Sequence, residues 1–202
     1  MTDQFITAFK RPGAPVHRGK FLSRVFGIFS EEIVRIWAAD ARAPFEDLGR
    51  PTVHNDDVRS TLDFTFRSRE TGAVFPAELK CEIEYEGYRY FVLNDVGQLA
   101  HHNKPAFAAL LAAAARRPGL RAFVQKREVA VDGAILVWGA ATAEGRLAVA
   151  RDKGFFAVLT LEDMIADLRA WQSHRFQTLV EERRAWANEL CDALVRPATD
   201  AP

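Results

Sequence analysis

STLDFTF at residues 60–66 and AVFPAELKCEIEYE at residues 73–86 are two strand-like stretches joined by a polar turn, SRETG. In the first stretch apolar and polar side chains alternate, which is the period-two pattern of a half-buried strand. A third stretch, YRYFVLN at 88–94, has the same character and follows after a short turn. Three consecutive strands with short connections predict an antiparallel meander.

Helical patterns flank these strands. Residues 21–41 place their apolar side chains on one stripe at about 100° per residue, and the Ala/Leu-rich segment 96–117 stops at a Pro-Gly pair. The apolar run GAILVWGAA at 133–141 predicts a strand buried on both faces. Further elements are expected as a helix at 144–154, a strand at 155–161 and helices at 162–171 and 173–194. We therefore predict an α/β fold, a mixed central sheet flanked by helices.

Turn-forming residues separate these elements into one domain with two extensions. Residues 1–19 are rich in Pro and Gly and are expected to form an arm, and the segment 43–60 is expected to be loop. The α/β domain is predicted over 20–170. A C-terminal helical extension, 171–202, is expected to pack on the same domain. Its expected buried side consists of Leu179, Trp186, Leu190 and Leu194, and the alternative is that it forms the seam of a homodimer.

Composition limits the classes of protein that fit. The chain has 202 residues, of which 49% are apolar, enough for a sizeable core, and its formal net charge is zero. A polybasic coat for nucleic acid is thereby excluded as the main binding device. The two cysteines lie far apart, no secretory signal is visible, and the longest apolar run, 106–115, is half a membrane span. We expect a cytoplasmic protein with no membrane partner.

Two carboxylates and an ammonium are expected on one face of the sheet. Asp63 is followed, after 14 residues, by Glu78-Leu79-Lys80. Side chains alternate along a strand, so Glu78 and Lys80 share a face, and pairing of the first two strands brings Asp63 close. Oxygen ligands of this kind suit Mg²⁺, with Mn²⁺ as a substitute. Such a metal polarises a scissile phosphate and activates a bound water, which Lys80 would orient or deprotonate.

This Asp/Glu-x-Lys arrangement, after a helix and before a helix and a buried strand, resembles the PD-(D/E)xK nuclease superfamily. The resemblance covers roughly 21–141 and implies a restriction-endonuclease-like core in the order α-β-β-β-α-β. It also implies a metal-dependent nuclease that hydrolyses phosphodiester bonds in DNA. In that comparison Asp63 and Glu78 are metal ligands and Lys80 is the residue that orients the water. The family's Pro before the Asp is Leu62 here.

Two further positions match the superfamily by location. Members often carry a metal-binding Glu on the first helix, and here Glu31 lies opposite the apolar stripe whereas Glu32 borders it. Glu32 is therefore the expected third ligand. One branch of the superfamily carries Gln-x-x-x-Tyr on the helix after the third strand. This chain has Gln98 and His102 one turn apart, with His in place of Tyr, and the resemblance makes Gln98 an accessory catalytic residue.

Other readings of these residues remain open at this point. Glu82 and Glu84 continue the alternation beyond Lys80, which is also typical of a solvent-exposed strand face with cross-strand charge pairs. His54 with Asp56 and Asp57 reads as a solvated loop, with phosphate or metal contact as the alternative. Basic residues that offer contacts to a nucleic-acid backbone are Arg116, Arg117, Arg121, Lys126 and Arg127. The rival function is a non-catalytic nucleic-acid- or protein-binding module that retains the nuclease fold.

Overall fold

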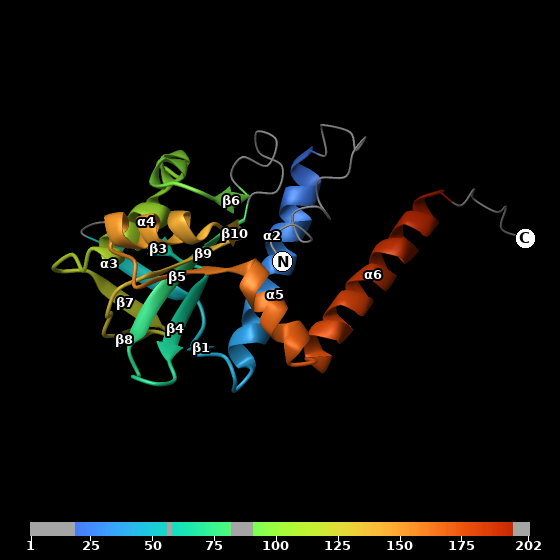
Figure 1. The fold of residues 1–202 in the computed structure, drawn as a ribbon, viewed down its shortest axis with the longest axis horizontal. Helices are drawn as coiled ribbons and strands as arrows, with labels where there is room; N and C mark the ends of the chain where they lie inside the picture. Colours follow the sequence, from blue (N-terminus) through green and yellow to red (C-terminus); the bar gives the residue numbers. More distant parts are fainter. Residues whose placement is uncertain (1–18, 56–57, 82–90, 196–202) are drawn as a thin grey trace, which may run out of the picture.

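A mixed five-stranded sheet forms the centre of the molecule (Figure 1). The computed structural model describes residues 19–55, 58–81 and 91–195. In spatial order the strands are β1 (Phe45–Asp47), β4 (Phe64–Ser68), β5 (Val74–Lys80), β9 (Ile135–Trp138) and β11 (Ala157–Thr160). β4 runs antiparallel to its two neighbours β1 and β5, and β9 and β11 run parallel to β5. The predicted mixed α/β class is confirmed, as are the buried strand within 133–141 and the strand within 155–161.

The strands β4 and β5 form the expected hairpin. Their register pairs Phe64 with Ala77 and Phe66 with Phe75. The turn closes with the amide of Ser68 donating to the carbonyl of Ala73 at 2.8 Å. Asp63 lies at a bend immediately before β4 rather than within the strand.

Helices cover both faces of this sheet and produce two apolar cores. The helices are α2 (Gly19–Ala39), α3 (Pro105–Ala114), α4 (Ala143–Lys153), α5 (Leu161–Ala170) and α6 (His174–Val195). In the first core α2 and α5 pack on one face, where Trp37 and Leu168 meet Leu79 of β5. In the second, α3 packs on the opposite face, where Leu110 meets Trp138 of β9. Because β5 alternates, Leu79 faces the first core while Glu78 and Lys80 face the side of the second.

A second, four-stranded antiparallel sheet includes residues 51–55 and 58–61, most of which the sequence pattern predicts to be loop. In spatial order its strands are β3 (Val58–Thr61), β2 (Pro51–Asn55), β7 (Arg121–Val124) and β8 (Arg127–Val129). The expectation of loop over 43–60 is therefore wrong, since β1, β2 and β3 all lie there. These strands are short and mostly polar, so neither the apolar alternation nor the length that marks a strand is present. β2 pairs with β7, with Val53 opposite Ala122, 69 positions later in the chain, and β3 pairs with β2.

The predicted third strand of the meander pairs elsewhere. Among the described residues of 88–94, β6 (Val92–Leu93) pairs in parallel with β10 (Ala140–Ala141), not with β5. Residues 82–90, which include Glu82, Glu84 and the first three residues of that stretch, lie outside the described residues, as do the predicted arm up to residue 18 and Asp56 and Asp57.

The helix expected over 96–117 is divided in two. A 3-10 helix, η1 (Val96–His101), is followed by α3, which begins at Pro105. Lys104 has extended backbone angles, as a residue before proline requires, so the first helix cannot continue through it. The other predicted helices are confirmed with small changes at their ends.

The C-terminal helix contacts the domain through its first turns (Figure 1). Phe176 and Leu179 are buried in the first core, and Arg183 pairs with Glu32 of α2 at 2.8 Å. Beyond that point the prediction of a buried side is wrong, because Trp186, Leu190 and Leu194 are exposed by 58%, 40% and 77%. The stripe continues at helical spacing, but the helix extends past the edge of the domain and nothing in the described residues covers it. Within the same residues, no helix combines the length and apolar character needed to cross a membrane.

The start of α4 is packed directly against the backbone of β6, and this contact predicts a large stability effect. A Cβ on Gly145 would clash with the carbonyl oxygen of Leu93 and approach the backbone of Asn94 to 2.8 Å. We expect Gly145→Ala to lower the free energy of unfolding by roughly 2 kcal/mol or more, since backbone atoms cannot move aside as a flexible side chain can. Thermal or urea unfolding measures the change.

Gly27 in α2 provides the matched control for that substitution. A Cβ there would meet no atom within 4 Å. Gly27→Ala should therefore raise the free energy of unfolding by about 0.5–1 kcal/mol, the ordinary helix preference of alanine. Equal effects of the two substitutions would contradict the packing described for Gly145.

Candidate active site

Asp63 is fixed against β5 by its own carboxylate. Its Oδ2 accepts a hydrogen bond from the backbone amide of Leu79 at 2.9 Å. Its Oδ1 accepts one from the guanidinium of Arg50 at 3.2 Å. The bend before β4 therefore places the Asp63 carboxylate beside the Glu78-Leu79-Lys80 segment, which is the juxtaposition that the hairpin predicted.

Glu78 is buried in the middle of the sheet. It lies opposite Leu136 of the parallel neighbour β9 and is 6% exposed. Its Oε1 accepts a hydrogen bond from Nζ of Lys80 at 2.6 Å. Its Oε2 is also buried and has no hydrogen-bond partner in the structure. The reading of an ordinary exposed strand face therefore does not describe Glu78, because exposed carboxylates are solvated on both oxygens.

The electrostatics of Glu78 follow from this burial. Loss of solvation raises the pKa of its carboxyl, and the ammonium of Lys80 lowers that pKa. The negative charge of Asp63 raises the pKa again, whereas a contact with the backbone of Asp63 lowers it. The net direction is upward. A buried acid with one unpartnered oxygen is costly to ionise, and a cation at Oε2 would remove that cost.

These residues fit a hard divalent cation. Mg²⁺ is held in proteins by one or two carboxylates, with water and substrate oxygens completing its shell. Asp63 and Glu78 provide two such groups, and the unpartnered Oε2 provides a free ligand atom. Among the described residues no group of three or more His, Cys, Asp or Glu side chains is arranged to hold a metal. Any ion here would therefore keep several waters.

The expected third ligand and the expected accessory residue are engaged elsewhere. Glu32 forms a bidentate pair with Arg183 of α6, at 2.8 and 3.2 Å. Gln98 closes a capping box at the start of η1, where its Oε1 accepts from the amides of Asn94 and Asp95 and its amide donates to the carbonyl of Val92. Both side chains thus hold backbone or helices in place in this structure, and their metal and catalytic roles stay predictions.

Two residues near the site were not assigned a role in it from the sequence. Arg50, which pairs with Asp63, lies in a turn before β2 that carries no motif. The ring of His102 packs on Phe107 and Trp138, at centroid distances of 5.1 and 5.5 Å. Burial lowers the pKa of His102 to about 4, and the nearby charge of Lys80 contributes to that shift. The imidazole is therefore neutral near pH 7 and adds no positive charge beside Lys80. The partial Gln-x-x-x-His match was the signal that pointed to it.

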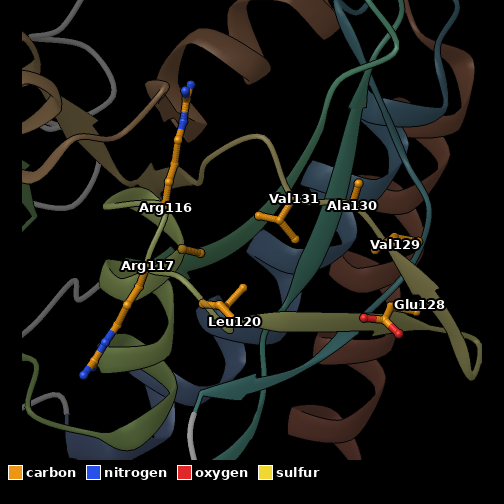
Figure 2. Close-up of a pocket in the computed structure, with 8 residues that line it drawn as sticks. Arg116, Arg117, Leu120, Glu128, Val129, Ala130 and Val131 are labelled. Atoms are coloured by element: carbon orange, nitrogen blue, oxygen red, sulfur yellow. The ribbon is translucent and has the colours of Figure 1, made fainter.

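A pocket lies away from this cluster (Figure 2). It encloses about 360 Å³ between the end of α3 and β8. Its lining consists of Ala113, Arg116, Arg117, Leu120, Glu128, Val129, Ala130 and Val131. The side chains of Arg116 and Arg117 extend away from the pocket in Figure 2. No residue of the Asp63, Glu78 and Lys80 cluster lines it, so the pocket does not bear on the chemistry of that cluster.

Comparison with known proteins assigns neither a family nor a function to this chain. No protein-family model, curated protein or solved structure matches the chain.

Proposed function

We propose that this protein is a metal-dependent nuclease that hydrolyses phosphodiester bonds, with DNA as its substrate. The observation that carries the proposal is the buried, unpartnered Oε2 of Glu78, close to the carboxylate of Asp63 and the ammonium of Lys80. A buried acid in this state costs stability, and such a cost is typical of functional sites.

The order of elements around the site supports a restriction-endonuclease-like core. The elements α2, β1, β4, β5, α3 and β9 follow the order α-β-β-β-α-β, with β1, β4 and β5 antiparallel and β9 parallel to β5. The second sheet is then an insertion, with β2 and β3 between β1 and β4 and with β7 and β8 before β9. In this reading the meander of the core is formed by β1, β4 and β5, instead of the three strands expected from the sequence.

Each residue of the cluster has a distinct task in the proposed reaction. Asp63 and Glu78 would hold Mg²⁺, or Mn²⁺ in its place. When bound, the metal polarises the scissile phosphate and lowers the pKa of a coordinated water. The hydrogen bond from Lys80 holds Oε1 of Glu78, and Oε2, which has no protein partner, would be the ligand atom for the ion. The Lys80 ammonium would orient the attacking water and offset negative charge on the phosphate.

The direct test is cleavage of supercoiled plasmid and of labelled single-stranded DNA by the whole protein. We expect strand breaks in Mg²⁺ or Mn²⁺ and none in EDTA. We also expect the thermal unfolding temperature to rise with either metal, because an ion that binds the folded state stabilises it. Cleavage that continues at full rate in EDTA would contradict the proposal.

One observation favours the second candidate, a binding module that retains the fold without catalysis. Both oxygens of Asp63 accept hydrogen bonds, one of them from Arg50, which can replace a metal as the source of positive charge. In such a module neither Mg²⁺ nor Mn²⁺ would stabilise the protein. The unfolding measurement in metal therefore separates the two candidates even where no cleavage is detected.

A further inference from the structure

The four-stranded sheet has one face packed on the second core and one face turned outward. Val53, Ser60, Ala122 and Val124 point inward and are buried. Because side chains alternate along each strand, their neighbours point outward. We call this outward surface the basic-aromatic face. It consists of Thr52, His54, Arg59, Thr61, Arg121, Phe123 and Glu128, all exposed or half-buried.

The register of the strands arranges this face in two rows. The first row runs Arg59, His54, Arg121 across β3, β2 and β7. The second row runs Thr61, Thr52, Phe123, Glu128 and extends onto β8. Neighbouring strands lie about 4.8 Å apart, so the first row is about 10 Å long. Basic groups and an aromatic ring thus lie in adjacent rows of one open surface.

Phe123 is the centre of the face, and its neighbours hold its ring. His54 packs against it with ring centroids 5.0 Å apart, and the guanidinium of Arg121 lies 5.1 Å from its centroid. Arg121 is kept in place by a bidentate pair with Glu128, at 2.6 and 2.8 Å. The guanidinium lies over the ring of Phe123 and the imidazole packs beside it. A flat group can therefore stack on the guanidinium, or on the ring itself once Arg121 turns towards a phosphate.

We propose that the basic-aromatic face binds single-stranded nucleic acid, with a base stacked at Phe123 and the backbone phosphates along the row of Arg59, His54 and Arg121. Arg59 carries a positive charge that complements a phosphate backbone, Arg121 adds a second once it leaves Glu128, and aromatic stacking tolerates any base. A duplex keeps its bases stacked inside and cannot present one to Phe123. The inference deepens the proposed function, because it names single strands as the form of the substrate. It rests on the proposed function to the extent that the bound strand is the substrate of the nuclease.

The chemistry of the face favours this ligand over an acidic peptide. A peptide carboxylate would use the arginines and leave Phe123 without a planar partner. A nucleotide uses both rows, since its phosphate and its base are separated by a sugar. Glu128 opposes binding in this arrangement. It neutralises Arg121 in the free protein, and its ion pair with Arg121 must break before Arg121 can contact a phosphate.

Binding is measured by fluorescence anisotropy with a labelled single-stranded oligodeoxynucleotide, its RNA counterpart and a duplex of the same sequence. EDTA is present so that cleavage does not interfere. We expect Phe123→Ala to weaken single-strand binding about tenfold, which is within the 1–3 kcal/mol measured for base–aromatic stacking, without changing the dependence on salt. Phe123→Leu, which keeps the apolar volume, should weaken binding similarly.

The charged variants give separate readouts. Arg59→Gln should reduce the slope of log K against log salt by about 0.7, the value of one phosphate contact on a single strand. Glu128→Gln should tighten binding, because it removes the acid that competes for Arg121. Arg151→Gln, an exposed arginine on α4 away from the face, is the matched control and should leave the affinity unchanged.

Several results would overturn the inference. The first is that the protein does not bind the single strand. The second is that it binds the duplex with equal affinity and that neither Phe123→Ala nor Phe123→Leu weakens binding. The third is that polyglutamate, at equal charge concentration, displaces the oligonucleotide completely. The last would indicate an acidic protein partner. Failure here is distinguishable from failure of the nuclease proposal. The binding assay contains no metal, so its outcome does not depend on whether the protein cleaves DNA.

Discussion

Glu78→Gln should reduce metal-dependent cleavage at least ~100-fold and abolish the stabilisation of the protein by Mg²⁺ or Mn²⁺. Glutamine has nearly the volume of glutamate, so the packing against Leu136 is retained. It can still accept the hydrogen bond of Lys80 through its amide oxygen, but it cannot provide an anionic ligand at the position of Oε2. The expected loss corresponds to several kcal/mol of transition-state stabilisation, at about 1.4 kcal/mol for each factor of ten.

The measurement compares initial cleavage rates and unfolding temperatures with and without metal. The change on the metal-free protein should be small, because a buried charge with an unpartnered oxygen is replaced by a neutral group of the same shape. Glu31→Gln is the matched control: Glu31 is a carboxylate on α2 paired with Arg35 at 2.8 Å, away from the cluster. It should retain both cleavage and metal stabilisation.

The opposite pattern would refute the assignment of Glu78. If Glu78→Gln cleaves at the wild-type rate, Glu78 is not a metal ligand and the cluster is structural. A second result would also count against the assignment: the wild-type protein shows neither cleavage nor metal stabilisation, and Glu78→Gln is more stable than the wild type. The buried acid would then lower the stability of the protein without serving as a metal ligand. The binding-module candidate then accounts for the fold.

The hairpin that carries the cluster was predictable because its information is local. Alternation in 60–66 and 73–80, together with a short polar turn, specifies two paired strands and therefore brings Asp63 to Glu78. The buried strand β9 was predictable for a similar reason, since an apolar run between glycines fits a strand covered on both faces. The hairpin places Asp63 beside Glu78 and Lys80, and β9 lies next to the strand that carries Glu78 and Lys80.

The burial of Glu78 was not predictable, because it depends on a distant segment. A Glu-x-Lys-x-Glu alternation is typical of an exposed strand face. Glu78 is buried because β5 lies inside the sheet, next to residues 135–138, and because α3 packs against β5. The four-stranded sheet was missed for the same reason, since β2 is completed by β7. Trp186 was predicted to be buried because it lies at helical spacing from other apolar residues, but it is exposed. Helical spacing identifies an apolar face and does not show whether another surface covers it.

Lys80→Met is expected to separate catalysis from metal binding. Methionine keeps much of the apolar stem of lysine and removes the ammonium that hydrogen-bonds Oε1 of Glu78 at 2.6 Å. We expect cleavage to fall at least ~100-fold, the usual range for loss of a group that assists proton transfer or offsets developing charge. Because Asp63 and Glu78 remain, the metal should still stabilise the variant, unlike Glu78→Gln.

The pH dependence of that stabilisation gives the second readout. Burial raises the pKa of Glu78 above its ordinary value of 4.5, and Lys80 acts against that shift. An acid whose pKa is raised in the folded state favours folding at low pH and loses that contribution as pH rises through the raised pKa. The metal binds the ionised form, so stabilisation by Mg²⁺ should grow with pH over this window.

Removal of the Lys80 ammonium deletes an interaction that lowers the pKa of Glu78, so the pKa must rise further in Lys80→Met. The rise of metal stabilisation should therefore begin at higher pH in Lys80→Met than in the wild-type protein. Thermal unfolding with and without Mg²⁺, at intervals from pH 5 to 9, measures the displacement.

A curve that coincides with that of the wild type would mean that Lys80 does not act on the metal-binding form of Glu78. Lys104→Met, at an exposed position, should leave the curve in place. Because the two predictions for Lys80→Met rest on different properties of the same ammonium, a loss of cleavage with no displacement of the curve would assign Lys80 to the substrate and not to Glu78.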